Sequence, residues 1–260
     1  MYSQATGDDP FETPMRIAPG AHFAMGGLWS DYDMMTSVPG LFVGGEVGWG
    51  YHGANRLGAN SLLSACVDGW FTLPYSVPNY LAGLLGQPPL AAQHEAVGEA
   101  LDAVQARVHR LLDNNGTQGP DRFHKRLGEL LYKYAGVTRT PEGLARGIEE
   151  IRALREEFWS DVRVMGTGDH LNQELERAGR IADYLEMAEL LCLDGLDRDE
   201  SCGAHFREDH QSTDGEALRD DDNWCFVSAW ESPSTPDASF VRHDEPLRFE
   251  AVPLQTRNYK

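Results

Sequence analysis

The middle of the chain carries apolar residues at the spacing of amphipathic helices. Over residues 87–197 they recur every three or four positions, which places them along one face of a helix. The four stripes are Val97, Leu101, Val104, Val108 and Leu111; Phe123, Leu127, Leu130, Leu131 and Tyr134; Leu144, Ile148, Ile151, Leu154 and Phe158; and Leu171, Leu175, Ala178, Ile181, Leu185, Ala188 and Leu191. Thr140 and Pro141 supply an N-cap and a first-turn proline for the third stripe. Helices with one apolar face and short loops predict an antiparallel bundle whose stripes form the core.

The first part of the chain is patterned differently. Leu-Phe-Val stands between glycines within residues 40–47 and predicts a short buried strand, and residues 59–71 predict a helix that follows it. Pro74 and Pro78 then interrupt the helical pattern. The run Gly86-Gln-Pro-Pro-Leu is the best candidate for a domain boundary, because two prolines after a glycine end one element and begin another.

The last part of the chain, after Asp197, is polar and rich in turn residues. The alternation of Leu247, Phe249 and Ala251 predicts one late strand. Three aromatic residues, Trp224, Phe226 and Trp230, are expected to attach this segment to the rest of the molecule. The sequence therefore predicts an α+β, predominantly helical protein.

Composition limits the classes of function. With 260 residues, of which 41% are hydrophobic, the chain can bury a substantial core. Its formal net charge of −19 argues against binding nucleic acid, since phosphate neutralisation needs clustered Lys and Arg. An acidic surface of this kind more commonly serves solubility.

Four widely spaced cysteines, Cys66, Cys192, Cys202 and Cys225, form no C-x-x-C pair, so we expect reduced thiols and no metal or iron–sulfur ligand set. Acidic residues occupy the N-terminus where a signal peptide would need a basic and then apolar run, and no window approaches a membrane span of about 20 apolar residues. We therefore expect a protein that is cytosolic or faces the cytosol, with a partner subunit providing any membrane anchor.

Gly48, Gly50 and Gly53 match the dinucleotide fingerprint G-x-G-x-x-G, after the predicted strand and before the predicted helix. The match is poor, because Trp49, Tyr51 and His52 are bulky where a pyrophosphate would approach bare backbone, and no second parallel strand follows. The alternative is a helix entry over residues 53–63 whose free N–H groups face an anion. A third interpretation is that these glycines only allow close packing of helix and strand.

Arg56 and His22 are the candidate ligand-binding side chains. A guanidinium in an apolar, glycine-rich surround needs an anionic partner, and its planar fork fits a carboxylate in a two-pronged contact. From the residues alone, this partner is either a bound carboxylate or Glu46. His22 lies in a turn, where a lone histidine is more often structural than a ligand.

Five segments together resemble one family. They are Pro19-Gly-Ala-His22-Phe-Ala-Met-Gly26-Gly27, Val38-Pro-Gly-Leu-Phe-Val-Gly-Gly45-Glu46, His52-Gly-Ala-Asn-Arg56-Leu-Gly-Ala-Asn60-Ser61-Leu62-Leu63, Glu200-Ser-Cys-Gly-Ala-His-Phe-Arg-Glu208 and the terminal Leu254-Gln-Thr-Arg-Asn-Tyr-Lys260. They resemble the flavoprotein subunit of succinate dehydrogenase and fumarate reductase, over nearly the whole chain. The family's N-terminal half, with its flavin fingerprint, has no counterpart here, so we expect the chain to be the C-terminal piece of a larger enzyme.

The resemblance implies a division into domains and a set of site residues. Residues 1–25 would end the capping domain, 26–86 belong to the FAD-binding domain, 87–197 to the helical bundle and 198–260 to a loop-rich C-terminal extension. Dicarboxylate binding falls to His22, Arg56 and Ala59, and FAD contacts fall to Gly45, Glu46, Ser61 and Leu62. The family's acid/base arginine would lie upstream, so no catalytic residue is assigned in this chain.

The implied function is succinate and fumarate interconversion with FAD as the cofactor. The implied partners are the upstream flavoprotein half, an iron–sulfur subunit and a membrane-anchor subunit, which would hold the chain at the inner face of the cell membrane. Two alternatives stay open: a soluble flavoenzyme similar to aspartate oxidase, and a non-catalytic helical docking module. His52 is unassigned, and His205 and Arg207 are interpreted as a structural or subunit-interface cluster, with His210 solvated.

Overall fold

The computed structural model describes residues 1–16, 20–233 and 239–255. Within these ranges helices predominate and the sheet has two strands, which confirms the predicted α+β, predominantly helical class. None of the helices described combines the length and apolarity needed to cross a membrane. The chain divides into two compact units, Met1–Gly83 and Leu84–Lys260, which we call unit 1 and unit 2. The finer boundaries expected after residues 25, 86 and 197 stay predictions.

Unit 1 consists of short helical elements joined by tight turns. These are α1 (Tyr2–Thr6), the 3₁₀ turn η1 (Gly45–Val47), α2 (Asn60–Val67), the π-helical η2 (Asp68–Thr72) and α3 (Leu73–Ala82). The strand expected over residues 40–47 is wrong, because this segment makes only an isolated bridge between Met35 and Phe42 before η1 begins. Gly40 and Gly45 adopt left-handed backbone angles, φ +84° and +67°, and turn the chain at both ends of the apolar triplet.

The expected interruption at the prolines is also wrong, because α2, η2 and α3 follow one another without a break. Pro74 falls in the first turn of α3, directly after the π-helical η2, and Pro78 lies inside α3. Much of the apolar surface of this run is exposed. The exposed side chains are Leu62 (71%), Leu63 (61%), Trp70 (79%), Phe71 (68%) and Tyr75 (70%).

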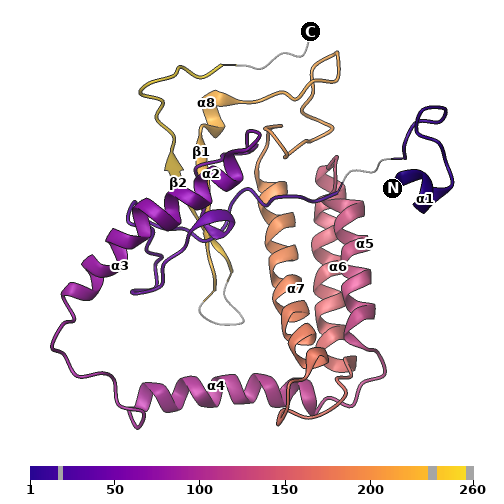
Figure 1. The fold of residues 1–260 in the computed structure, drawn as a ribbon. Coiled ribbons are helices and arrows are strands. Elements are labelled where there is room, and N and C mark those ends of the chain that lie inside the picture. The colour runs from indigo at the N-terminus through magenta and orange to yellow at the C-terminus, as the bar shows by residue number, and fades with distance from the viewer. Residues whose placement is uncertain (17–19, 234–238, 256–260) are drawn as a thin grey trace. The chain divides into compact units, whose positions relative to one another are not determined.

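Unit 2 is organised around three helices that lie side by side, α5 (Pro120–Tyr134), α6 (Pro141–Asp161) and α7 (Gln173–Asp197) (Figure 1). Thr140 caps α6 as expected, accepting a hydrogen bond from Gly143 N. Their core is formed by Leu111, Phe123, Leu127, Leu144, Ile148, Ile151, Leu154, Phe158, Ala178, Ile181, Leu185, Ala188 and Cys192.

Ion pairs between these helices show how the helices run relative to one another. Arg126 in the middle of α5 pairs with Glu157 near the end of α6, and Arg177 near the start of α7 pairs with Asp121 at the start of α5. Neighbours α5 and α6 therefore run antiparallel, and the predicted bundle is confirmed for α5, α6 and α7.

Helix α4 (Glu95–Leu112) forms as expected, but its apolar stripe is not core. Leu101 and Val104 are 54% and 62% exposed, and Leu111 in the last turn is buried. Only the final turns reach the bundle, where Arg107 pairs with Asp183 of α7, while the rest of α4 runs away from it (Figure 1). A second error is Leu171, which precedes the Asn172 N-cap of α7 and is 94% exposed.

The segment after α7 contains the short helix α8 (Asp221–Trp224) and an antiparallel hairpin of β1 (Phe226–Glu231) and β2 (Val241–Pro246). The strand expected at residues 247–251 is wrong, since β2 ends at Pro246. The expected aromatic attachment is confirmed: Trp230 Nε1 donates to Asp194 Oδ1 of α7 at 2.7 Å, and the Arg198 guanidinium lies over Trp224 and Phe226.

Candidate functional site

Unit 1 brings together three segments that carry the predicted site residues: residues 22–28, 44–56 and 59–68. The first two join backbone to backbone, because Leu28 N donates to Val47 O at 2.8 Å. A Cβ atom on Gly27 would stand 2.2 Å from Val47 O, so glycine is required there for this close approach. Pro19, which begins the first family segment, and residues 256–260 of the terminal one lie outside the described residues.

Arg56 is tied to the first segment through an aromatic ring. Its guanidinium carbon lies 4.8 Å from the centroid of Phe23, and the same ring meets His52 edge-on at 5.3 Å. Arg56 donates from Nη1 to Leu57 O at 2.9 Å, while Nε is buried without a hydrogen-bond partner among the described residues. A guanidinium held against an aromatic face with an unsatisfied donor is suited to an incoming anion.

His22 precedes Phe23 directly, so the Arg56–Phe23 contact brings both predicted carboxylate ligands to the same part of unit 1. His22 is exposed, and in the described part of the chain it makes no hydrogen bond. The alternative pairing of Arg56 with Glu46 is wrong. Glu46 instead accepts a hydrogen bond at Oε1 from Ala24 N at 2.7 Å, and no ion pair joins these two described residues.

Glu46 follows Gly45 in the 3₁₀ turn η1, and this turn is anchored by a buried acid that the sequence analysis missed. Asp68 is 3% exposed and accepts at Oδ2 from Gly45 N and from the Tyr51 hydroxyl, both at 2.7 Å. Burial, and then the hydrogen bond to Asp68, raise the pKa of the Tyr51 phenol. A lone acid inside the apolar run from Leu62 to Leu73 was the signal that could have identified it.

Ala59, Ser61 and Leu62 lie at the start of α2. Ala59 is the N-cap residue with φ +64°, and no side chain caps the helix. The first-turn N–H groups therefore have no side-chain acceptor, and together with the positive end of the helix dipole they favour an anion. Gly53 lies seven residues before the first helical residue, Asn60, so the dinucleotide fingerprint is not formed here.

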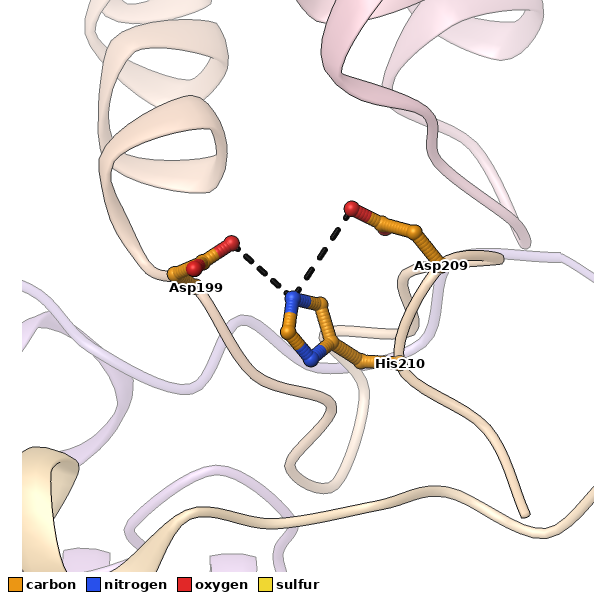
Figure 2. A group of neighbouring side chains, drawn as sticks. All are labelled: Asp199, Asp209 and His210. Atoms are coloured by element: carbon orange, nitrogen blue, oxygen red, sulfur yellow. Dashed lines mark hydrogen bonds and ion pairs between the residues drawn. The ribbon is translucent and has the colours of Figure 1, made fainter.

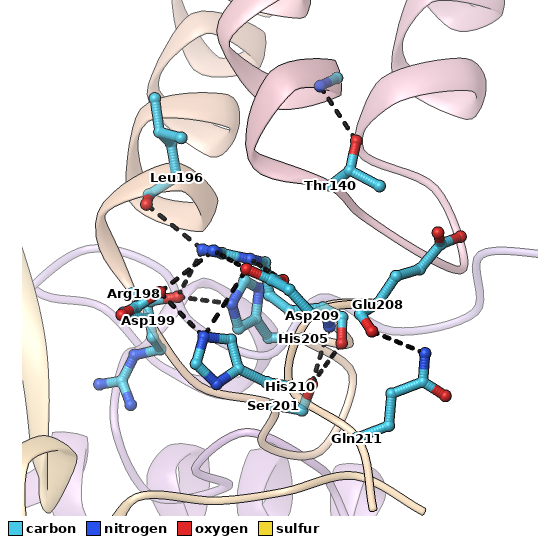
Figure 3. Close-up of polar contacts among 12 residues, drawn as sticks. Thr140, Leu196, Arg198, Asp199, Ser201, His205, Glu208, Asp209, His210 and Gln211 are labelled. Carbon is cyan, nitrogen blue, oxygen red and sulfur yellow. Dashed lines mark hydrogen bonds and ion pairs between the residues drawn. The ribbon is translucent and has the colours of Figure 1, made fainter. Parts of the chain in front are cut away.

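A second polar cluster lies in unit 2 around the end of α7. The buried Arg207 donates from Nε and Nη2 to the two carboxylate oxygens of Asp209, at 2.8 and 2.7 Å, and from Nη2 to Asp199 at 3.1 Å. Ser201 Oγ accepts from Arg207 N at 2.8 Å. His205 and His210 belong to the same cluster (Figure 3).

His205 has a defined protonation state in this cluster. Arg139 Nη1 lies 2.9 Å from His205 Nδ1, and His205 Nε2 lies 3.0 Å from Arg198 O. Because a guanidinium only donates and a carbonyl only accepts, Nδ1 is the acceptor and Nε2 carries the proton. Burial lowers the pKa of His205 and keeps the ring neutral.

His210 lies between two carboxylates, as Figure 2 shows, with Nε2 at 2.9 Å from Asp199 and 3.8 Å from Asp209. The expectation of a solvated His210 is therefore wrong. Asp199, Asp209 and His210 offer ligand atoms within 4.8 Å of one another, a spacing that a metal ion could use. The same carboxylate oxygens already accept hydrogen bonds from Arg207, so the cluster is built as an ion-pair network around that guanidinium.

Both units match known family models. Residues 124–259 match the model described as fumarate reductase flavoprotein C-term, and residues 2–62 match the FAD binding domain model.

Individual relatives give the same result. The chain is similar to the succinate dehydrogenase flavoprotein subunit of Bacillus subtilis, with 34% identity over 243 residues, which are 90% of this chain and 39% of the relative. It is 30% identical over 220 residues to L-aspartate oxidase of Synechocystis, covering 80% of this chain and 37% of that protein. A solved E. coli quinol fumarate reductase chain superimposes with a TM-score of 0.80 at 28% identity, covering 97% of this chain and 41% of that one. The chain thus spans about two fifths of the length of the relatives it matches.

Proposed function

Because this chain belongs to the succinate dehydrogenase and fumarate reductase flavoprotein family, we propose that it contributes dicarboxylate and FAD contacts to the interconversion of succinate and fumarate. In this proposal unit 1 is the end of a capping domain followed by part of the FAD-binding domain. Unit 2 is the helical bundle with its C-terminal extension. The observation that carries the proposal is the placement of Arg56 on Phe23, next to His22, beside an uncapped helix start.

The dicarboxylate contacts come from Arg56, His22 and Ala59. Arg56 supplies a two-pronged cation for one carboxylate, and the absence of any ion pair to Arg56 among the described residues supports that role. The exposed His22 donates to a carboxylate, and Ala59 offers its N–H at the positive end of α2. These groups position the diacid and stabilise its charge, while no group in this chain is assigned the transferred proton.

The FAD contacts come from the turn η1 and the start of helix α2. Glu46 is proposed to accept hydrogen bonds from cofactor hydroxyls, with Gly45 allowing the turn, while Ser61 and Leu62 present backbone N–H groups. The match of residues 2–62 to an FAD binding domain and the open start of α2 support this assignment. When bound, FAD supplies the hydride acceptor of the reaction.

The proposed partners are the upstream flavoprotein half, an iron–sulfur subunit and a membrane-anchor subunit that holds the complex at the inner face of the membrane. The aromatic residues Trp70, Phe71 and Tyr75 support a partner on unit 1, because all three are exposed within one helical run and exposed apolar side chains that lie near one another often mark an interaction site.

The proposal is tested by the substitution Arg56→Lys in this chain assembled with an upstream flavin-domain half. An ammonium cannot reproduce a two-pronged contact, so we expect succinate to bind about 10- to 100-fold more weakly, as for the loss of a charged hydrogen bond. Flavin absorbance during a succinate titration measures this. The matched control is Arg16→Lys, whose guanidinium is 87% exposed and lies 3.6 Å from Asp8. Equal affinity for succinate in the wild type and the Arg56→Lys variant would contradict the clamp.

L-aspartate oxidase chemistry is a second candidate, favoured by the 30% identity to the Synechocystis enzyme. The same assembly distinguishes the two, since aspartate but not succinate would then reduce the flavin. If neither substrate reduces the flavin and only subunit binding persists, the chain is the non-catalytic docking module.

A further inference from the structure

Asp68 is the one buried acid of unit 1 in the part of the chain that the structure describes. It begins η2, directly after α2, and its Oδ2 accepts hydrogen bonds from Gly45 N and from the Tyr51 hydroxyl. Burying a carboxylate is costly unless it is hydrogen-bonded or paired with a cation, and no salt bridge to Asp68 occurs among the described residues. Two charge-assisted hydrogen bonds are therefore what stabilise it in this position.

The turn η1, which Asp68 anchors, packs closely against α2 and η2. Gly44 and Gly45 have the minimal side chain there: a Cβ atom at Gly44 would stand 3.3 Å from Asp68 Cβ, and one at Gly45 would stand 3.4 Å from Ala65 Cβ. Gly45 also adopts φ +67°, which places Glu46 on the side of the turn that faces Ala24 N. Asp68 thus fixes the residue immediately before Glu46.

We propose that Asp68, with Tyr51 as its second donor, is a positioning residue that holds the Gly45 turn so that the Glu46 carboxylate is aimed at a hydroxyl-bearing cofactor chain. The proposal rests on the proposed FAD-binding function of unit 1. Removing the charge weakens the hydrogen bond to Gly45 N, the turn relaxes, and Glu46 loses its fixed direction. Asp68 itself contacts neither cofactor nor substrate in this account.

The first test measures the turn without any cofactor. Amide hydrogen exchange of the Gly45 and Ala24 N–H groups is compared in the wild-type chain and the variants Asp68→Asn and Tyr51→Phe. We expect about tenfold faster exchange at both amides in Asp68→Asn, and a smaller increase in Tyr51→Phe, which keeps the carboxylate but removes one donor. The matched control is Ser76→Ala, which removes a buried hydroxyl that donates to Thr72 O in the same helical run.

The second test uses the chain assembled with an upstream flavin-domain half and measures FAD dissociation. Asp68→Asn is expected to weaken FAD binding about tenfold and to leave succinate affinity of the loaded protein unchanged. Unchanged exchange at Gly45 and Ala24 in Asp68→Asn, or a uniform increase across unit 1, overturns the positioning role. If the wild-type assembly binds no FAD, the proposed function fails, while the exchange result still decides whether Asp68 holds the turn.

Discussion

Units 1 and 2 are held together by different interactions. Unit 2 buries the apolar stripes of α5, α6 and α7 in one continuous core, in which Phe123, Ile151 and Phe158 are fully buried. Unit 1 has few buried apolar side chains, of which Val43 is one, and relies on backbone hydrogen bonds and on the buried Asp68. Two of its large aromatic side chains, Trp70 and Phe71, are exposed.

This difference separates a unit with a continuous apolar core from one that lacks such a core. Unit 2 gains its stability from the burial of apolar area, the dominant favourable term in folding. In unit 1, Ala59 has a left-handed backbone conformation and the buried Nε of Arg56 has no hydrogen-bond partner among the described residues. Such features cost stability and are typical of ligand-binding sites. The predicted ligand-binding residues therefore fall in the unit that is less well packed.

The largest expected effect is the loss of a core side chain from unit 2. Phe158 is fully buried and meets Phe123 edge-on at 5.3 Å, so Phe158→Ala should lower the free energy of unfolding by about 3–5 kcal/mol. Denaturant unfolding followed by far-UV circular dichroism measures this. Phe71→Ala in unit 1, where the ring is 68% exposed, is the control and should change stability by about 0.5 kcal/mol or less. Similar losses in both variants would remove the distinction between the two units.

A smaller loss is expected from the ion-pair network at the end of α7. Arg207→Met removes the paired hydrogen bonds to Asp209 and the contact with Asp199, and should cost about 2 kcal/mol. This is below the roughly 3–5 kcal/mol of a fully buried pair, because the two aspartates are exposed and water can solvate them. The same measurement on Arg146→Met, a surface pair with Glu150, should show about 0.5 kcal/mol or less. Arg207→Met with no greater cost than this control would show that the network is not structural.

A pH-dependent contribution should come from His205. Because burial lowers its pKa in the folded state below the usual 6.5, the unfolded chain binds the proton more readily. The stability that neutral His205 contributes to the folded state is fully present above pH 6.5 and is lost as the pH falls below that value. Protonation would place a buried positive charge beside the Arg139 guanidinium. The midpoint of denaturant unfolding, followed between pH 7.5 and 5.5 in the wild type and in His205→Gln, measures the difference. Parallel pH profiles for the two proteins would contradict the neutral assignment.

The sequence predicted the parts of the fold in which local pattern and burial coincide. The stripes of α5, α6 and α7 face a shared core, so their periodicity was sufficient. The stripe of α4 predicted the helix correctly and its burial wrongly, because periodicity identifies an apolar face and says nothing about whether a partner covers it. Strand β2 was missed because its residues are mostly polar and exposed, which leaves no alternation to detect.

The candidate site was predicted through family segments, and the family with its FAD cofactor is confirmed by the matching models. The individual roles of His22, Arg56 and Glu46 stay predictions. Phe23 and Asp68 were missed because their roles arise from contacts distant in sequence: Phe23 meets Arg56 33 positions later, and Asp68 meets Gly45 23 positions earlier. Such contacts depend on how turns bring segments together. The lone acid in an apolar run signals that Asp68 is buried, but no local pattern identifies Gly45 or Tyr51 as its partners.

The smallest expected effect tests whether strain is stored at the uncapped start of helix α2 in unit 1. Ala59 holds φ +64°, which costs an L-residue about 1–2 kcal/mol, whereas glycine adopts it freely at an entropic cost of about 0.5–1 kcal/mol. Ala59→Gly should therefore raise the free energy of unfolding of unit 1 by about 0.5 kcal/mol, measured by hydrogen exchange of the α2 amides. The control is Ala65→Gly inside α2, where the same change should cost about 1 kcal/mol because the helix interior disfavours glycine. If Ala59→Gly destabilises α2 as much as Ala65→Gly does, the left-handed backbone at the helix start stores no strain, and unit 1 loses one of the features that set it apart from the bundle.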